Sequence, residues 1–158
     1  MSYSYLLTKA IASAAIDFVL PSVRKLAEGK VLKRNQFHIV VASRGFSPDF
    51  EASILAEHSE NRSAWEFPFG EIARQKCKMS WTSGLSTREI HQLHPQLLLA
   101  GDTVYYGSVV CPGNVVACSG VEAYFDEMIS TWVQAACNAL CHRGREALQA
   151  TNKDAFIT

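Results

Sequence analysis

The chain has 158 residues, of which 48% are hydrophobic, and its 15 Lys and Arg balance its 15 Asp and Glu to a formal net charge of zero. A chain of this length buries about two-thirds of its unfolded surface, so we expect a single domain over residues 1–158 that needs no disulfide or metal to fold. A neutral chain lacks the positive field with which nucleic-acid-binding proteins find phosphate, which excludes that class.

The apolar runs and the cysteines of the sequence indicate in which cellular compartment the protein is expected. No uninterrupted apolar run reaches the roughly 18 residues of a membrane helix, and Lys9 and Asp17 interrupt the apolar N-terminus, so we expect neither a membrane span nor a signal peptide. The cysteines fit no disulfide framework of small secreted proteins, so we expect reduced thiols and a cytoplasmic protein. They are Cys77, Cys111, Cys118, Cys137 and Cys141.

The first part of the chain predicts one helix and two strands. Apolar residues recur at helical spacing over residues 5–28, which indicates an amphipathic helix that Pro21 should end or kink. Residues 37–42 are rich in β-branched side chains, and residues 51–58 alternate between apolar and polar, so both predict strands. The turn residues between them indicate a hairpin or near-hairpin.

The middle of the chain predicts a loop and two helices. Residues 61–70 lack a regular pattern, whereas residues 71–81 place apolar side chains on one helical face. Ser86 and Glu89 have the spacing of a capping box, so a short helix should start at Ser86 and end before Pro95.

The last third predicts a second hairpin and a long helix. A Cys-Pro-Gly turn separates the strand-like residues 103–110 and 114–119. Ser119 and Glu122 have capping-box spacing, and the helix that follows carries a wide apolar stripe, so it should pack against the sheet or a partner subunit. Near-zero charge favours a homo-oligomer, with this C-terminal helix as its contact. We expect the tail, residues 151–158, to be frayed.

Two stretches of the sequence resemble motifs of the GlcG/HbpS-like family, which comprises heme-binding proteins and domains like the C-terminal domain of PduO. The run IARQKC at residues 72–77 is similar to the family's I-A-x-x-K-A helix, with Gly84 and Thr87 placed like the G-x-x-T that follows it. Residues 107–126, GSVVCPGNVVACSGVEAYFD, are similar to its closing hairpin and the acidic start of its last helix. The order of predicted elements is similar as well.

The resemblance implies an α+β, profilin-like fold, a three-layer α/β/α arrangement in which an antiparallel five-stranded sheet has helices on both faces. It also implies a homo-oligomer that binds heme or a related tetrapyrrole. Our first hypothesis is therefore an oligomeric small-molecule-binding protein that holds heme, or another planar or carboxylate-bearing molecule, between the sheet and an adjacent helix or subunit. The alternatives are an enzyme of unknown reaction, with Cys118, His38 or His58 at work in the same pocket, and an accessory protein without a ligand.

Two histidines are candidate ligands. His38 lies on the first predicted strand and His58 at the end of the second, so paired strands would bring them close to each other. An aromatic loop with Trp65, Phe67 and Phe69 follows and would form a wall beside them. An axial heme or metal ligand in a pocket is one interpretation, and a pair of ordinary sheet histidines is the other.

Four residues of the second hairpin are further candidates. Cys111 and Cys118 would serve as a thiolate ligand or nucleophile. Ser119 and Gly120 precede a predicted helix start, where free backbone N–H groups suit a propionate or another carboxylate. A capping box would use some of the same donors, so a purely structural role is the alternative.

Two other clusters favour structural roles. Cys137 and Cys141 share one helical face, which predicts apolar thiols packed in a helix interface, and His142 points elsewhere. His91 and His94 also share a face, but no third ligand is identifiable, so we expect no metal site.

Overall fold

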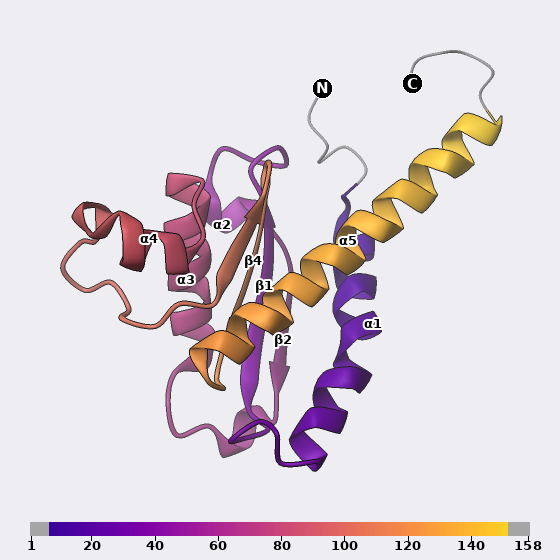
Figure 1. Cartoon of the computed structure of the whole chain (residues 1–158). Coiled ribbons are helices and arrows are strands. Elements are labelled where there is room, and N and C mark those ends of the chain that lie inside the picture. The colour runs from indigo at the N-terminus through magenta and orange to yellow at the C-terminus, as the bar shows by residue number, and fades with distance from the viewer. Residues whose placement is uncertain (1–6, 152–158) are drawn as a thin grey trace.

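The computed structural model describes residues 7–151 and shows an α+β fold built on one antiparallel sheet (Figure 1). The α+β class and the antiparallel pairing are therefore confirmed. The strands of the sheet are β1 (Phe37–Ser43), β2 (Ile54–Glu60), β3 (Ser108–Cys111) and β4 (Asn114–Ser119). They lie side by side in the order β2-β1-β4-β3.

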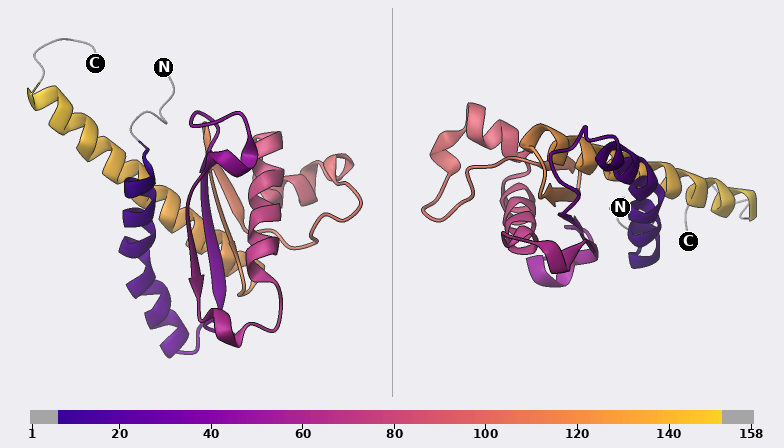
Figure 2. Two further views of the ribbon diagram at one scale, coloured as in Figure 1. Left: turned by 180° about the vertical axis from the view of Figure 1, so that it is seen from behind. Right: turned by 90° about the horizontal axis from the view of Figure 1, so that it is seen from below.

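Helices cover both faces of the sheet (Figures 1 and 2). α1 (Lys9–Glu28) and α5 (Ala123–Thr151) pack against each other and against one face, whereas α3 (Phe69–Ser83) packs against the other. α5 extends well beyond the sheet (Figure 2). The remaining short helices are α2 (Phe50–Ser53), η2 (Arg62–Ala64), α4 (Thr87–Leu93) and η3 (Pro95–Leu97).

The expected count of five strands is wrong for the described residues, which form four. The strand expected over residues 103–110 begins only at Ser108. Before it, a turn closes between Leu99 and Asp102, and the Gly107 N–H donates to the side chain of Thr87 rather than to a neighbouring strand. The segment before β3 therefore stays off the sheet, and β3 is an edge strand.

Strand β1 is the centre of the core because it is buried along its whole length. Its Ile39 and Val41 belong to the apolar cluster under α1 and α5, and its Val40 and Ala42 belong to the cluster under α3. Successive side chains of a strand point to opposite faces, so a continuous apolar run is what a strand covered on both sides requires.

The first helix continues through Pro21 to Glu28, so the expectation that Pro21 ends it is wrong. Pro21 is exposed, while Leu20 and Val23 on either side of it are buried against the core. The hydrogen bond that Pro21 cannot make thus lies on the solvent side, where water replaces it, and apolar burial on the inner side maintains the helix. Residues 5 and 6 of the expected helix lie outside the described residues.

Both hairpins form, with shifted strand boundaries. The second strand starts at Ile54 instead of residue 51, because the Asp49 carboxylate caps the short helix α2 and holds the chain out of the sheet until Ser53. The fourth strand has the expected bounds.

The two capping-box predictions have opposite outcomes. Ser86 is the N-cap of α4 and its Oγ accepts the Glu89 N–H at 3.2 Å, as predicted. Ser119 does not cap the last helix, because it stays in β4, and α5 begins only at Ala123. Of the expected frayed tail, Thr151 is the last residue of α5, and residues 152–158 lie outside the described residues.

A buried ion pair joins α3 to the start of α5. Lys76 of α3 is fully buried, and its Nζ donates to Asp126 Oδ2 and to the Cys118 carbonyl, both at 3.0 Å. Asp126 Oδ1 accepts the Val121 N–H at 3.1 Å. Burial raises the pKa of Asp126 to about 6, against the attraction of Lys76, which lowers it. Each charge therefore depends on the other for its stability.

Thr87 and Gly107 extend this junction to α4 and β3. Thr87 Oγ1 accepts the N–H groups of Gly107 and Ser108 at 2.9 and 3.0 Å, and Ser130 Oγ donates to the Gly107 carbonyl at 2.5 Å. A Cβ at position 107 would lie 2.7 Å from the Cys118 carbonyl oxygen, so only glycine fits there. We name these residues, with Lys76 and Asp126, the polar junction.

We expect Lys76→Met to lower the free energy of unfolding by about 3–5 kcal/mol, because it leaves the Asp126 carboxylate buried without a counter-charge. Chemical denaturation monitored by circular dichroism measures this. The double variant Lys76→Met/Asp126→Asn should recover part of the loss, since no buried charge remains.

The loss in Lys76→Met should also depend on pH. Without Lys76, the pKa of Asp126 in the folded state rises above its present value of about 6, while its unfolded value stays near the ordinary one. A folded pKa above the unfolded one means that stability falls as pH rises between the two values. Destabilisation that does not increase from about pH 5 to pH 8 would contradict this assignment.

Candidate functional site

His38 lies in a polar cluster on the face of the sheet that α3 covers. Its Nδ1 is 2.8 Å from Ser59 Oγ, and its Nε2 is 3.0 Å from Glu57 Oε1. His38 is directly opposite Ser59 in the β1–β2 pairing, and Glu57 is two residues before Ser59, so the three side chains share one face. We name Ser59, His38 and Glu57, with Arg74, the His38 cluster.

Arg74 of α3 completes the His38 cluster. Its Nε and Nη2 donate to the two oxygens of Glu57 at 2.7 and 2.6 Å, a bidentate pair that fixes the carboxylate. The pKa of Glu57 is lowered to about 2, mainly by the hydrogen bond from His38 and also by the hydrogen bond and charge of Arg74, while burial opposes the shift. Glu57 is therefore an ionised acceptor at neutral pH.

Aromatic side chains border the His38 cluster, as the sequence predicted for the loop. The Trp65 ring meets His38 edge-on at 5.9 Å between centroids, and the Phe69 ring lies 5.6 Å from Trp65. Gly70 at the start of α3 is next to both, since a Cβ at this position would be 3.6 Å from Trp65 and 3.8 Å from His38 Nδ1. The absence of a side chain at Gly70 thus leaves space beside the histidine.

His58 is not part of this site, because it lies on the opposite face of the sheet. It pairs with Ile39 instead of His38, and this offset of one residue reverses the direction of its side chain. Its Nε2 is 3.2 Å from Glu60, which Arg24 of α1 holds at 2.7 and 3.1 Å. The expected shared pocket between the two histidines does not form.

Three of the four hairpin candidates, Cys118, Ser119 and Gly120, are buried. Cys118 is fully buried, and burial followed by the charge of Asp126 raises the pKa of its thiol well above the ordinary value, which rules out a thiolate. The N–H of Val121 is used by Asp126. A Cβ at Gly120 would collide with the backbone of Gln36, and Ser119 is a buried strand residue, so no anion fits there.

Cys111 and the helical cysteines differ in exposure. Cys111 is half-buried at the end of β3, where Asn138 Nδ2 lies 3.9 Å from its sulfur. Cys137 is buried and Cys141 half-buried, and burial raises the pKa of both thiols, to about 12 for Cys137. The prediction of packed thiols in α5 is confirmed.

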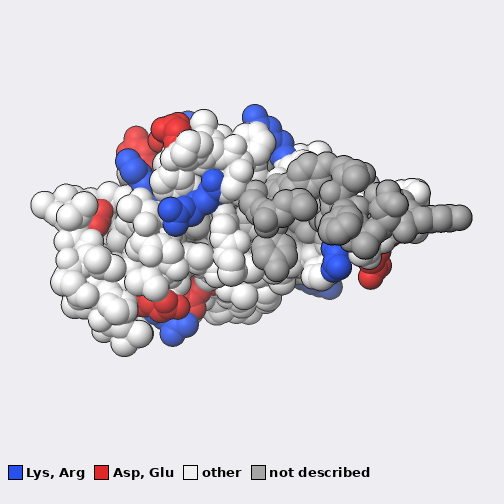
Figure 3. Space-filling model, turned by 90° about the horizontal axis from the view of Figure 1, so that it is seen from above, with Lys and Arg blue, Asp and Glu red and all other residues white. Residues whose placement is uncertain are grey.

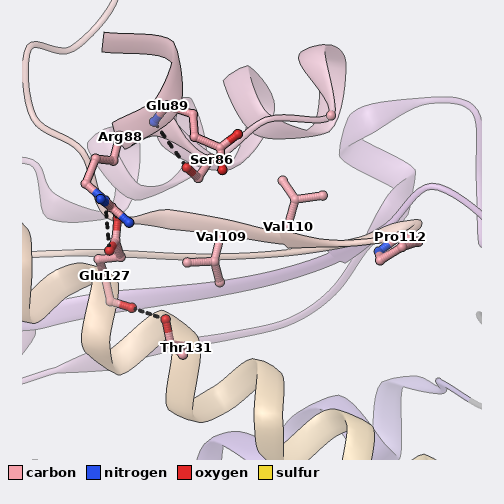
Figure 4. Close-up of a pocket in the computed structure, with 9 residues that line it drawn as sticks. Ser86, Arg88, Glu89, Val109, Val110, Pro112, Glu127 and Thr131 are labelled. Carbon is pink, nitrogen blue, oxygen red and sulfur yellow. Dashed lines mark hydrogen bonds and ion pairs between the residues drawn. The ribbon is translucent and has the colours of Figure 1, made fainter. Parts of the chain in front are cut away.

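A second feature is a pocket of about 410 Å³ between the edge strand β3, α4 and α5 (Figure 4). Arg88 of α4 points across it, with its Nε 2.9 Å from Glu127 Oε2 of α5. The apolar part of the wall comes from β3 and the turn after it. The lining residues are Gly84, Ser86, Arg88, Glu89, Val109, Val110, Pro112, Glu127 and Thr131.

Sequence reasoning missed both Ser59 and Arg88. Glu57 and Ser59 carry a usable signal, since polar residues two apart on a strand share a face, but their pairing with His38 depends on a register that no local pattern fixes. Arg88 meets Glu127 across 39 residues of sequence, so only the packing of α4 against α5 reveals the pair.

Comparisons with known proteins leave the chain without an assigned family. No protein-family profile matches the sequence, and no curated protein matches it. Within residues 7–151, no group of three or more His, Cys, Asp or Glu side chains is placed to hold a metal ion. None of the helices in that range combines the length and apolar character that crossing a membrane requires.

We expect Arg74→Met to raise the pKa of Glu57 from about 2, because it removes a bidentate hydrogen bond and a positive charge. The pKa should stay below the ordinary value of 4.5, since the hydrogen bond from His38 remains. NMR titration of the Glu57 carboxylate measures this shift. The matched control Arg143→Met, in the exposed part of α5, should leave it unchanged.

Proposed function

We propose that the protein is a small-molecule-binding module of the GlcG/HbpS-like kind, with a profilin-like layered fold, that acts as a homo-oligomer in the cytoplasm. Its ligand is a small carboxylate-bearing molecule held in the pocket between β3, α4 and α5. The single observation that carries this proposal is Arg88, a guanidinium set in a pocket with an apolar wall.

The donor arrangement of Arg88 supports a carboxylate. Its Nε is committed to Glu127, and its terminal Nη atoms make no hydrogen bond within residues 7–151. A guanidinium fork binds a carboxylate through two parallel hydrogen bonds, so the free edge of Arg88 suits that group. Val109 and Val110 also line the pocket and offer apolar surface to the part of the ligand that does not carry the carboxylate.

The polar junction supports the family resemblance. Lys76 comes from the IARQKC stretch, Thr87 from the G-x-x-T-like stretch, and Gly107 and Asp126 bound the closing hairpin stretch. All four meet in one buried network. The residues that carry the resemblance therefore act together in packing, which is the behaviour expected of a motif that defines a fold.

Free cysteines and exposed apolar side chains support the compartment and the assembly. All five cysteines are free thiols, as in a reducing compartment. The proposed contact through α5 uses the part of that helix that extends beyond the sheet, where Leu148 is 37% exposed. The segment from α4 to β3 offers further apolar contact surface, namely Leu93, Leu97, Leu99, Val104 and Tyr105.

Charge does not oppose such contacts. Figure 3 shows basic and acidic side chains interspersed on the face that it displays, beside a broad uncharged area over the α4 end of the molecule. Lys and Arg equal Asp and Glu in number, so two copies of the chain repel each other little.

Heme is the ligand that the resemblance implies, but the described residues do not fit an axial ligand for it. The lining of the pocket holds no His, Cys, Met or Tyr. Both ring nitrogens of His38 are occupied by Ser59 and Glu57, and Nε2 of His58 is occupied by Glu60. Coordination of iron by His38 would break one of these hydrogen bonds, so heme stays a prediction from the resemblance alone.

We expect benzoate to bind the wild-type protein saturably, with shifts of the Arg88, Val109 and Thr131 amides in two-dimensional NMR. Arg88→Gln should weaken binding about tenfold or more, because it removes the charged fork. Glu127→Gln should strengthen binding, since it removes the carboxylate that competes for Arg88. Arg145→Gln is the exposed control. Amide shifts that do not saturate at benzoate concentrations up to about 10 mM would contradict the proposal.

We expect hemin to give a broad, unsaturating absorption rise in the wild type and equally in His38→Ala and His58→Ala, because hydrogen bonds hold both ring nitrogens of His38 and Nε2 of His58. The measurement is absorption in the Soret region during titration. A sharp stoichiometric band that one of the two variants loses would instead establish heme as the ligand and displace the carboxylate proposal.

A further inference from the structure

A hydroxyl, an imidazole and a carboxylate form a hydrogen-bonded chain through Ser59, His38 and Glu57. This chain lies outside the pocket between β3, α4 and α5, which we name the carboxylate pocket. The two hydrogen bonds measure 2.8 Å from Ser59 Oγ to Nδ1 and 3.0 Å from Nε2 to Glu57 Oε1. Since Glu57 is ionised, Nε2–H donates to it, and Nδ1 is then the acceptor for the Ser59 hydroxyl. The same three roles of nucleophile, base and orienting acid occur in serine hydrolases, although there the serine bonds to Nε2 and the acid to Nδ1, so the two imidazole nitrogens are exchanged here.

The scaffold holds the three groups rigidly. Ser59 and Glu57 lie on one face of β2, His38 lies opposite Ser59 on β1, and the bidentate Arg74 fixes the carboxylate from α3. The Trp65 edge packs on the imidazole. Such support on strands and by a second layer of contacts is what a reactive constellation needs, because small displacements cost large factors in rate.

The surroundings of Ser59 offer access and hydrogen-bond donors. Ser59 is half-buried and Glu57 is exposed, whereas His38 is only 8% exposed, so solvent reaches the residues at the two ends of the chain more than the imidazole. Gly70 leaves space beside Nδ1, and within the described part of the chain the N–H groups of Gly70 and Glu71 have no acceptor. Free N–H groups of a first helical turn stabilise negative charge on oxygen.

We propose that Ser59, His38 and Glu57 form an acyl-transfer site that hydrolyses small esters. Ser59 Oγ attacks the ester carbonyl carbon while its proton passes to Nδ1 of His38. The tetrahedral intermediate then expels the alcohol, which takes that proton, and an acyl group remains on Ser59. Water attacks the acyl carbon, His38 again takes and returns the proton, and the products are a carboxylic acid, an alcohol and free Ser59.

The site favours small esters with an aromatic or apolar group. Trp65 and Phe69 border it. The Arg62 guanidinium lies 5.8 Å from the Trp65 ring centroid and that of Arg34 lies 5.3 Å from the Phe69 ring centroid, while Nε and Nη2 of Arg74 are committed to Glu57. Ser59 is the nucleophile, His38 the base, and Glu57 a positioning residue that acts through His38.

The test is covalent labelling of the intact wild-type protein with a fluorophosphonate probe, followed by peptide mass mapping. We expect one adduct, on Ser59, and none in Ser59→Ala, while the exposed control Ser63→Ala is labelled like the wild type. No adduct on Ser59, or an adduct on another residue that persists in Ser59→Ala, would overturn the proposal. The labelling of the wild-type protein does not depend on any variant being able to fold.

Hydrolysis of p-nitrophenyl acetate provides a kinetic test of the same proposal. The rate of hydrolysis by Ser59→Ala should fall to the background rate, and kcat/KM of His38→Gln should be lower by about 100-fold or more. Glu57→Gln should lower kcat with KM unchanged, and Glu57→Asp should recover part of the loss, because it restores an acceptor for Nε2–H. Equal rates in the wild type and Ser59→Ala, with both folded by circular dichroism, would remove Ser59 from the reaction.

Discussion

The buried pair of Lys76 and Asp126 is the interaction on which the arrangement of the two candidate sites depends. Both side chains have left water, so each keeps its charge only in contact with the other. The pair ties α3, on one face of the sheet, to α5, on the other. Arg74 of the His38 cluster is on α3, and Glu127 of the pocket follows Asp126 on α5, so this contact helps to position one residue of each site.

The two faces of the sheet carry similar side chains in different surroundings. On the α1 face, His58, Glu60 and Arg24 form a closed set in which the arginine comes from a packed helix. On the α3 face, His38 and Glu57 meet Arg74 in the same way, but a serine and a glycine stand beside the imidazole. A histidine between a carboxylate and a hydroxyl can move a proton, whereas His58 has no such hydroxyl among its described partners.

The proposed binding site and the proposed acyl-transfer site use separate residues, so a test of one does not test the other. The pocket holds a guanidinium and an apolar wall, and its lining contains no histidine that could activate the hydroxyls of Ser86 and Thr131, which suits retention of a small anion. The His38 cluster holds a hydroxyl and a base on rigid strands. Cys118 accepts a hydrogen bond from Lys76 of the polar junction, Ser119 is buried in β4, and Gly120 lies against the backbone of Gln36. These residues therefore serve packing instead of ligand binding.

The sequence by itself determined the elements that depend on local chemistry: a strand over residues 37–42, both hairpins, the cap at Ser86 and the wide stripe of α5. Tertiary structure decided everything that depends on register or on the surroundings of a side chain. Pro21 stays in a helix because its outer side faces water, and Ser119 stays in a strand because α5 starts later. The register of β1 and β2 places His38 opposite Ser59, one residue away from His58, so the two histidines point to opposite faces of the sheet. No local sequence pattern encodes that register.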